Sequence, residues 1–580
     1  MVNDSKQFMS SNASSPRPNR VLLADYRPSQ NFFRSDQLLQ AYLQKHISGE
    51  GAAEMQPALH SLGEQAAGEM NQLSLLADQN PPALIKRNHL GEDINQIRFH
   101  PAYHRLLEIA VESRMFNIKW EPETRRRFAA ERHRLGFLSG YLYAMSESGQ
   151  YCPLCMTDGV ARLIDRYCTP QDRDRLLPRI ATLNPAELYT GAMFLTEKAG
   201  GSDVGANLVK ADQVEQTHYK LYGEKWFCSN ANAELIFALA RTREIPGTRG
   251  LGIFLVEKSR PDGSPNPLNI IRLKDKLGVR SMASAEILLE GTSGTLVGGE
   301  TEGFKIMADM INLSRLYNSV AALSAARRAV AEAWQFLSHR ISFGSVAKEH
   351  PLVRRKLLEL GSLNVINFYF VWKAIQLLDA ADNGDSDAAH LLRLLTPMVK
   401  KWSAETGVYV IREAMELHGG NGYIEDGVLP KLLRDACVLP IWEGAGNIMT
   451  LDMLRATHKS EGLQRMFSYI GAVAKAAQNS EQARAGKVLE TELRNLQAHF
   501  SELTDAPRET MEYAAGPLFA RLTNVYQLAL LTEELDNENR AWVGPAIEWL
   551  AEHLEGDRNK IEVEAPPAGE IIAGLMAWEF

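Results

Sequence analysis

The sequence predicts an α+β protein with a helical N-terminal domain, a middle antiparallel β domain, a C-terminal helical bundle and a C-terminal helical extension. A chain of 580 residues is too long for one compact core, so several structural units are expected. The hydrophobic pattern also changes period twice. From about 190 to 300, short runs such as AELIFALAR (233–241) alternate with Gly, Pro and Asn, as antiparallel strands do. On both sides of this stretch the spacing is helical.

These changes of pattern place the domain boundaries. We expect a disordered or extended arm over 1–34, a helical domain over 35–189, a barrel-like β domain over 190–300, a helical bundle over 301–458 and a helical extension over 459–580. Ser35 or Asp36 is suited to cap the first helix, because its side chain can accept from the free N–H groups there. Asn80-Pro81-Pro82 and His100-Pro101 mark later helix boundaries.

Composition excludes several classes of protein. The net charge of -8 gives no general reason to expect nucleic acid as a partner. No apolar run reaches about 20 residues, and the polar N-terminus has no signal core, so we expect a cytoplasmic protein without a membrane span. Cys152 and Cys155 form one CxxC pair, but no further ligands follow at suitable spacing. We therefore predict buried thiols and no metal site.

Two segments around the start of the β region have the character of a ligand site. Thr196 and Ser202 flank the Gly200-Gly201 turn, where backbone N–H groups can approach an anionic or carbonyl-rich ligand closely. The run Lys225-Trp-Phe-Cys-Ser-Asn230 places two aromatic rings before a hydroxyl, which suits packing on a flat ring and bonding to its edge. Each has an alternative interpretation, as an ordinary turn and an ordinary strand.

A third segment contains a carboxylate in an unusual setting. Glu443 lies between the bulky Trp442 and a glycine-rich turn. Burial beside an indole raises the pKa of a carboxyl group, and a carboxylate in that state can remove a moderately acidic C–H proton. The alternative is that Glu443 simply caps a helix beginning near Gly446.

Taken together, and in this order over about residues 100–455, the segments resemble the acyl-CoA dehydrogenase family. The family's flavin motifs are matched by Thr196–Asp203 and Phe227–Asn230, and the stretch Lys276–Ser281 resembles its Lys-Leu-Gly-x-Arg-x-Ser. The motif that presents the base is matched by Ile441-Trp442-Glu443-Gly444. Within the family the chain looks most like the AidB-like branch, of which Thr196-Glu-Lys198 and Asn80-Pro81-Pro82 are typical.

The resemblance implies an FAD-dependent α,β-desaturation of an acyl-CoA thioester, of medium to long chain, with Glu443 as the base and its own N–H as one donor to the enolate oxygen. It implies FAD contacts from Met193, Thr196, Ser202, Phe227 and Ser229, further contacts from Arg340, Phe343, Glu416 and Gly420 of a neighbouring protomer, and Asn447 near the adenine or ribityl side. It assigns Arg315 and Asn312 to the adenine end of CoA. An electron-transfer flavoprotein is the implied acceptor, and a homo-oligomer, with a tetramer favoured, is the implied assembly.

Some positions depart from the family pattern. The alternative position of the family's base is about Ser314, which offers no carboxylate, so Glu443 remains the candidate. Ala445 replaces a usual Thr, and Asn312 replaces an Asp found in many members.

Two alternatives stay open. One is an AidB-like flavoprotein that binds acyl-CoA or DNA with little turnover, and the other is a flavin oxidase or a dehydrogenase of carrier-bound chains. Residues 456–580 carry 20 acidic and 11 basic side chains, which argues against phosphate binding by that region.

Overall fold

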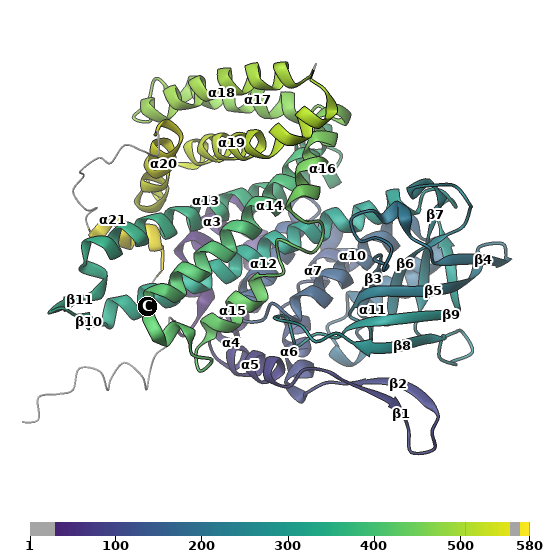
Figure 1. Cartoon of the computed structure of the whole chain (residues 1–580). Coiled ribbons are helices and arrows are strands. Elements are labelled where there is room, and N and C mark those ends of the chain that lie inside the picture. Colours follow the sequence, from purple (N-terminus) through teal and green to yellow (C-terminus); the bar gives the residue numbers. More distant parts are fainter. Residues whose placement is uncertain (1–28, 505, 557–568, 579–580) are drawn as a thin grey trace, which may run out of the picture.

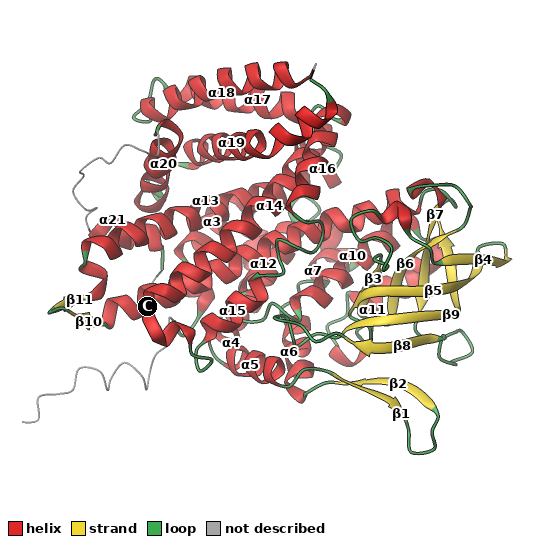
Figure 2. Ribbon diagram, viewed as in Figure 1, coloured by secondary structure: helices red, strands yellow, loops and turns green. Residues whose placement is uncertain are grey.

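The computed structural model describes residues 29–504, 506–556 and 569–578, and it has the predicted fold class (Figure 1). A long helical body carries the β domain at one end, and the four helices of the C-terminal extension stack along one side of the body (Figure 2). Within the described residues, no helix is long and apolar enough to cross a membrane. Of the arm expected over 1–34, residues 1–28 lie outside the described residues. The rest leads into α2, in which Phe32 and Phe33 are buried.

The N-terminal domain is helical with one exception. Asp36 caps α3 as predicted, with its side chain accepting from the Leu39 N–H, and Pro101 starts α6 after the His100 cap. The helices are α2 (Phe32–Ser35), α3 (Gln37–His46), α4 (Gly49–Ala67), α5 (Glu69–Gln79), α6 (Pro101–Glu112), α7 (Asn117–Trp120), α8 (Pro122–Arg127), α9 (Arg132–Ala144), α10 (Tyr151–Tyr167) and α11 (Pro170–Ile180).

The exception is a β-hairpin, β1 (Ala83–Arg87) with β2 (Asp93–Arg98), where the sequence was expected to be helical throughout. The prediction was wrong here because the partner of this segment is distant in the chain. Leu84 and Ile97 face each other across the hairpin and pack against the core of the β domain. Lys86 donates to the Ile270 carbonyl at 2.8 Å, which ties the hairpin to that domain.

The β domain is closed rather than open. Its strands are β3 (Gly191–Phe194), β4 (Lys210–Glu215), β5 (His218–Ser229), β6 (Leu235–Arg241), β7 (Leu251–Glu257), β8 (Leu268–Leu273) and β9 (Ser284–Val297). They follow the order β3-β6-β4-β5-β9-β7, and an additional β6–β7 pairing closes the ring, while β8 pairs with β9. Apolar side chains including Phe194, Leu221 and Phe254 fill the interior.

The sheet is mixed, although the sequence predicted antiparallel strands. β3 pairs with β6 in parallel, with Met193 beside Phe237, and β4 meets β6 at the parallel pair Lys210–Arg241. Strands adjacent in sequence can pair through a tight turn, whereas parallel neighbours need a longer connection. β4 and β5 supply that connection between β3 and β6. The pattern of each strand by itself does not indicate that β3 and β6 are parallel neighbours.

The C-terminal bundle surrounds one central helix. α12 (Gly303–His339) is buried over most of its length and packs against α13 (Pro351–Asp382), α14 (Ser386–Leu417), α9 and α10. The bundle also contains α15 (Val428–Ala436) and α16 (Gly446–Lys459). Beyond the end of α12 lie the short strands β10 (Ile341–Ser342) and β11 (Ser345–Val346).

The extension is helical, as predicted. It consists of α17 (Gly462–Ala477), α18 (Ala483–Thr504), α19 (Arg508–Glu534) and α20 (Arg540–Glu555), which pack on one another and on α13, α14 and α16 (Figure 1). A final helix, α21 (Gly569–Met576), returns to the body against α13. Trp578 then forms an isolated bridge with Asp36, so the two ends of the described chain meet.

Candidate active site

Glu443 lies in the loop between α15 and α16, and its backbone is in the left-handed region. Its φ is 57°, and Gly444 follows with a φ of 105°. A non-glycine residue rarely adopts such a φ and is strained there, so surrounding contacts must hold it. Two cationic side chains do so: Arg315 of α12 donates to the Glu443 carbonyl at 3.1 Å, and Lys400 of α14 donates to the Gly444 carbonyl at 2.7 Å.

The setting of the Glu443 carboxyl group favours a base. Burial raises its pKa, and the Ser314 hydroxyl with the charges of Arg315 and Lys400 offset part of that rise. Ser314 therefore lies beside Glu443. Ser314 is the alternative position of the family's base, and it offers no carboxylate. Burial also lowers the pKa of Lys400 to about 8.

Arg315 and Asn312 lie beside this loop. Arg315 donates to Asn312 Oδ1 at 3.0 Å and to Asp452 Oδ2 at 2.7 Å, and Arg393 donates to the other Asp452 oxygen at 2.6 Å. Arg315 thus joins α12, the Glu443 loop and α16. The role in binding the adenine end of CoA stays a prediction. The role in holding the base loop was not visible in the sequence, because Asp452 and Glu443 are more than a hundred residues away.

A small cavity of about 20 Å³ opens in front of Glu443. It lies between α10, α12 and the base loop, and its lining is Ser148, Tyr151, Cys152, Cys155, Met156, Ser314, Tyr317, Asn318, Ala321, Trp442 and Glu443. Cys152 and Cys155 are buried thiols, as predicted. Burial raises the pKa of Cys152 to about 12, so the thiol stays protonated near neutral pH. The sequence singled out Cys152, Cys155 and Ser314, whereas the other side chains from α10 and α12 carry no motif and sequence reasoning missed them.

The two predicted flavin segments lie side by side in the β domain. The Trp226 N–H donates to the Thr196 carbonyl at 2.9 Å, and Met193 lies in β3 leading to that turn. A buried ion pair between Glu197 and Lys225, 2.6 Å apart, joins the same two segments. Sequence reasoning did not predict this pair, although both residues belong to the motifs.

Phe227 offers an open aromatic surface at this junction. Its side chain is 54% exposed, although it is a large ring on a strand of a packed domain. The Lys274 ammonium lies 4.5 Å from its ring centroid, and Ser229 follows two residues later. An exposed ring with a hydroxyl group and a cation near it fits a planar aromatic ligand with hydrogen-bonding groups at its edge, such as an isoalloxazine.

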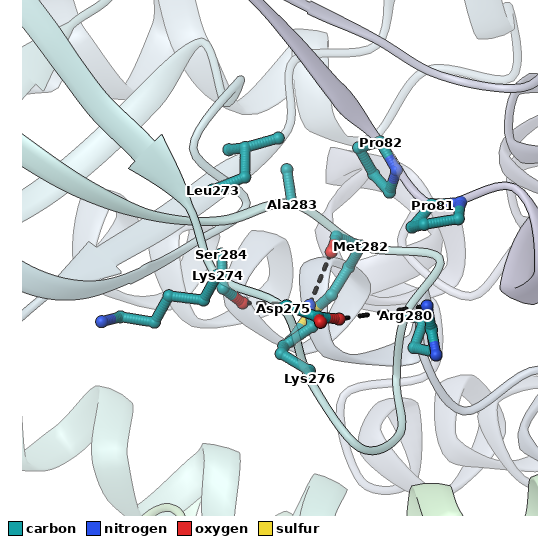
Figure 3. A pocket seen from close by; sticks show the side chains of 10 residues that line it. All are labelled: Pro81, Pro82, Leu273, Lys274, Asp275, Lys276, Arg280, Met282, Ala283 and Ser284. Atoms are coloured by element: carbon teal, nitrogen blue, oxygen red, sulfur yellow. Dashed lines mark hydrogen bonds and ion pairs between the residues drawn. The ribbon is translucent and has the colours of Figure 1, made fainter.

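A second cavity, of about 250 Å³, includes Lys274 in its lining and so lies near this aromatic surface. Figure 3 shows the side chains that line it. Lys276 donates to the Met282 carbonyl at 2.6 Å, and Arg280 lies 3.9 Å from Asp275. Ser284 on its wall is 3.4 Å from Ser229, so the cavity adjoins the predicted flavin edge. The full lining is Pro81, Pro82, Leu273, Lys274, Asp275, Lys276, Arg280, Met282, Ala283 and Ser284. Lys274 is paired with Glu286 at 2.8 Å and Arg280 lies near Asp275, so Lys276 is the basic side chain of the lining without a carboxylate partner among the described residues.

The remaining predicted flavin residues lie elsewhere. Arg340 follows the last turn of α12, 25 residues after Arg315, which is about 38 Å along a helix. Phe343 is 99% exposed in the β10–β11 turn at this far end (Figure 1), and Glu416 and Gly420 are exposed at the end of α14 and just after it. Asn447 is exposed in the first turn of α16, next to the base loop, and Ser202 is exposed in the turn after β3. The predicted residues therefore form two groups, one at each end of α12.

Comparison with known proteins identifies the family of this chain. The family model "Adaptive response protein AidB N-terminal domain" matches residues 25–184, and the middle and C-terminal domain models of acyl-CoA dehydrogenase match 192–292 and 301–458. "Putative acyl-CoA dehydrogenase AidB" of Escherichia coli (strain K12) is 34% identical over 73% of this chain and 78% of its own length. "Acyl-CoA dehydrogenase family member 11" of Caenorhabditis elegans is 27% identical over 88% and 85%.

Solved structures agree. Bd2924 in its apo form has a TM-score of 0.80 at 31% identity and covers 88% of this chain and 99% of its own. Caenorhabditis elegans ACDH-11 in complex with C11-CoA has a TM-score of 0.85 at 26% identity and covers 91% of both chains. With matching family models over three consecutive domains and a relative of this identity and coverage, the chain belongs to the acyl-CoA dehydrogenase family, in its AidB-like branch.

Proposed function

We propose that this protein is an FAD-dependent acyl-CoA dehydrogenase in which Glu443 removes the α-proton of an acyl-CoA thioester. The observation that carries the proposal is a carboxyl group with a raised pKa that lines a small cavity, on a loop whose backbone carbonyls accept from Arg315 and Lys400. The C11-CoA complex of the relative ACDH-11 supports an acyl-CoA as the ligand here.

The chain's own residues account for the proton transfer. The pKa of Glu443 is raised, which makes its carboxylate a stronger base than an exposed one. The thioester α-proton is only weakly acidic, so the oxygen that gains charge needs donors, and we assign the Glu443 N–H as one of them. Arg315 and Lys400 fix the loop that carries both groups.

The residues of the β domain fit FAD. Phe227 supplies the ring surface, Ser229 and Thr196 supply hydroxyls at its edge, and the basic side chains of the neighbouring cavity supply positive charge. FAD held by these residues would supply the hydride acceptor for the β-hydrogen, while Glu443 takes the α-proton and the product is a 2-enoyl thioester.

The distribution of predicted residues supports a homo-oligomer. Arg340 follows α12 about 38 Å along the helix from Arg315 beside the base loop, which favours contact of Arg340 with the flavin of another copy. A second copy that presents Arg340 and Phe343 to the surface around Phe227 completes the site, in line with the tetramer expected from the sequence. An electron-transfer flavoprotein remains the expected electron acceptor.

Anaerobic titration of the purified flavoprotein with acyl-CoA thioesters of increasing chain length tests the proposal. One length class should bleach the flavin absorbance, and the Glu443→Gln variant, which keeps the shape but not the base, should slow that step by about 10²-fold or more. Equal bleaching in the variant would refute the role of Glu443.

The other candidate is an AidB-like flavoprotein that binds acyl-CoA with little turnover. It takes the place of the dehydrogenase if dithionite reduces the flavin readily and no thioester does. DNA binding through the extension is not supported, because residues 456–580 carry 20 acidic and 11 basic side chains.

A further inference from the structure

In the larger cavity, beside the predicted flavin segments, one basic side chain has no carboxylate partner among the described residues. Lys276 lines this cavity, and its ammonium group donates to the Met282 carbonyl at 2.6 Å and to Ser284 Oγ at 3.3 Å (Figure 3). An ammonium group has three N–H donors, so one of them is left for a ligand. A desolvated charge without a counter-ion is costly, and a ligand that brings negative charge to this wall removes part of that cost.

The carboxylates that act on Lys276 from a distance are already paired with other cations. Asp435 is 2.7 Å from Lys431, and Asp78 is 2.9 Å from Arg434. Burial lowers the pKa of Lys276 to about 8, although Asp435 and Asp78 attract its charge. The ammonium group therefore stays mostly protonated at neutral pH, as a cation that lacks compensation.

The loop that carries this lysine is held in a strained conformation. Val279 has a φ of 48°, which a β-branched residue rarely adopts. Its N–H donates to Asp435 Oδ1 at 2.5 Å, and the Ser281 hydroxyl donates to Glu147 Oε1 at 2.7 Å. Lys431 is paired with both carboxylates, and all three charged side chains are buried. Strain that is held by a buried network at a cavity wall is typical of a preorganised site.

The same cavity adjoins the surface where FAD is proposed to bind. Lys274, whose ammonium group lies 4.5 Å from the Phe227 ring centroid, is part of its lining. Ser284, to which Lys276 donates, lies 3.4 Å from Ser229 at the predicted flavin edge. The volume of about 250 Å³ is close to the lower end of the range of about 300–1,000 Å³ that small-molecule sites occupy. The cavity therefore has room for one edge of a fused ring system.

We infer that Lys276 lies at the edge of the bound isoalloxazine and stabilises its reduced form. The inference rests on the proposed function for the presence of FAD. In that function Lys276 faces a ring that gains one negative charge with the hydride, while Glu443 takes the α-proton. Charge near the ring nitrogens is one means by which a protein sets the potential of a flavin. Because Lys276 attracts the charged ring more than the neutral one, it raises the reduction potential.

The reduction potential of the bound FAD, measured by equilibration with a dye of known potential, tests the inference. Lys276→Met removes the charge, so reduced FAD should bind about tenfold more weakly relative to oxidised FAD. For a two-electron couple this change corresponds to a potential about 30 mV lower. Lys276→Gln, which is also neutral but keeps an N–H donor for the Met282 carbonyl, should show the same shift.

The matched control is Lys276→Arg, which keeps the charge and should keep a potential close to that of the wild type. The unfolding temperature of each apoprotein shows that the variants are folded. The inference is overturned if both neutral variants have the wild-type potential, or if Lys276→Arg lowers the potential as much as they do. The comparison of Lys276→Gln with Lys276→Arg is decisive even if Lys276→Met does not fold.

The two proposals fail separately, because the measurement of the potential requires no thioester. If no thioester bleaches the wild-type flavin but the potential depends on the charge at position 276, the desaturation is refuted and the role of Lys276 stands. If thioesters bleach the flavin and the neutral variants keep the wild-type potential, the dehydrogenase stands without this role of Lys276.

Discussion

At the scale of single residues, the environment of Glu443 sets a pH dependence. Burial raises its pKa, and the base acts only when ionised. The rate of anaerobic flavin reduction by substrate should therefore be low in acid. It should rise as pH passes through a value above the ordinary range of a glutamate. Stopped-flow measurement of this rate against pH checks the prediction, and a rate constant independent of pH down to the ordinary glutamate range would contradict it.

Substitution of Lys400 tests whether the neighbouring charges set the pKa of Glu443. Its charge lowers the pKa of Glu443, and its ammonium donates to the Gly444 carbonyl. In Lys400→Met the pKa of Glu443 should rise further, so the pH profile of flavin reduction should move to higher pH. Lys401→Met serves as the control, because Lys401 is paired with Glu405 on α14 and is not among the groups that shift Glu443. An unchanged profile in Lys400→Met would show that the charge does not act on the base.

At the scale of elements, a buried arginine connects the segment around helix α21 to the helical body. Arg327 of α12 is paired with Asp36 at 2.8 Å and donates to the carbonyls of Met576 and Ala577. Tyr141 donates to the other Asp36 oxygen. One arginine thus joins the N-terminal helices, the bundle and the last described helix.

Removing that arginine should destabilise the protein strongly. Arg327→Leu leaves Asp36 buried without its partner, and the expected loss in the free energy of unfolding is about 3–5 kcal/mol. Thermal unfolding followed by circular dichroism measures it. The double variant with Asp36→Asn should recover part of the loss, because no buried charge then remains at this position. A single variant as stable as the wild type would contradict the role of this pair.

At the scale of the whole molecule, about 38 Å of α12 lies between Arg315, beside the base loop, and Arg340, at the far end of the helix. Phe343 is 99% exposed at one end and Phe227 is 54% exposed at the other. If a second copy brings these ends together, Phe343→Ser should weaken FAD binding by about tenfold or more, since aromatic anchors dominate interfaces. The flavin dissociation constant and the mass from light scattering should change together, while the unfolding temperature of the apoprotein stays the same.

Tyr513→Ser is the matched control, because Tyr513 is also an aromatic residue with 91% exposure but lies on α19 of the extension. It should leave flavin affinity and mass unchanged. A wild-type monomer that carries a full complement of FAD would contradict the shared site altogether.

The sequence predicted the motifs better than their surroundings. Thr196, Phe227 and Glu443 belong to contiguous patterns, so their residue types and spacing are visible in the sequence alone, and the structure places Thr196 and Phe227 together at one junction. Lys400 belongs to no pattern, and it looks like an ordinary polar residue on a long helix. Its significance comes from the Gly444 carbonyl that it contacts, which is distant in the chain.

By itself the sequence determined the order of helical and β regions, the helical extension, the family and the identity of the candidate base, because hydrophobic period, turn residues and motifs are local properties. Only the tertiary structure decided that residues 83–98 form a hairpin, that β3 runs parallel to β6, and that α12 separates the two flavin groups. Each of these depends on contacts between distant segments. The free energy of such contacts overrides local preference, and no short stretch of sequence contains it.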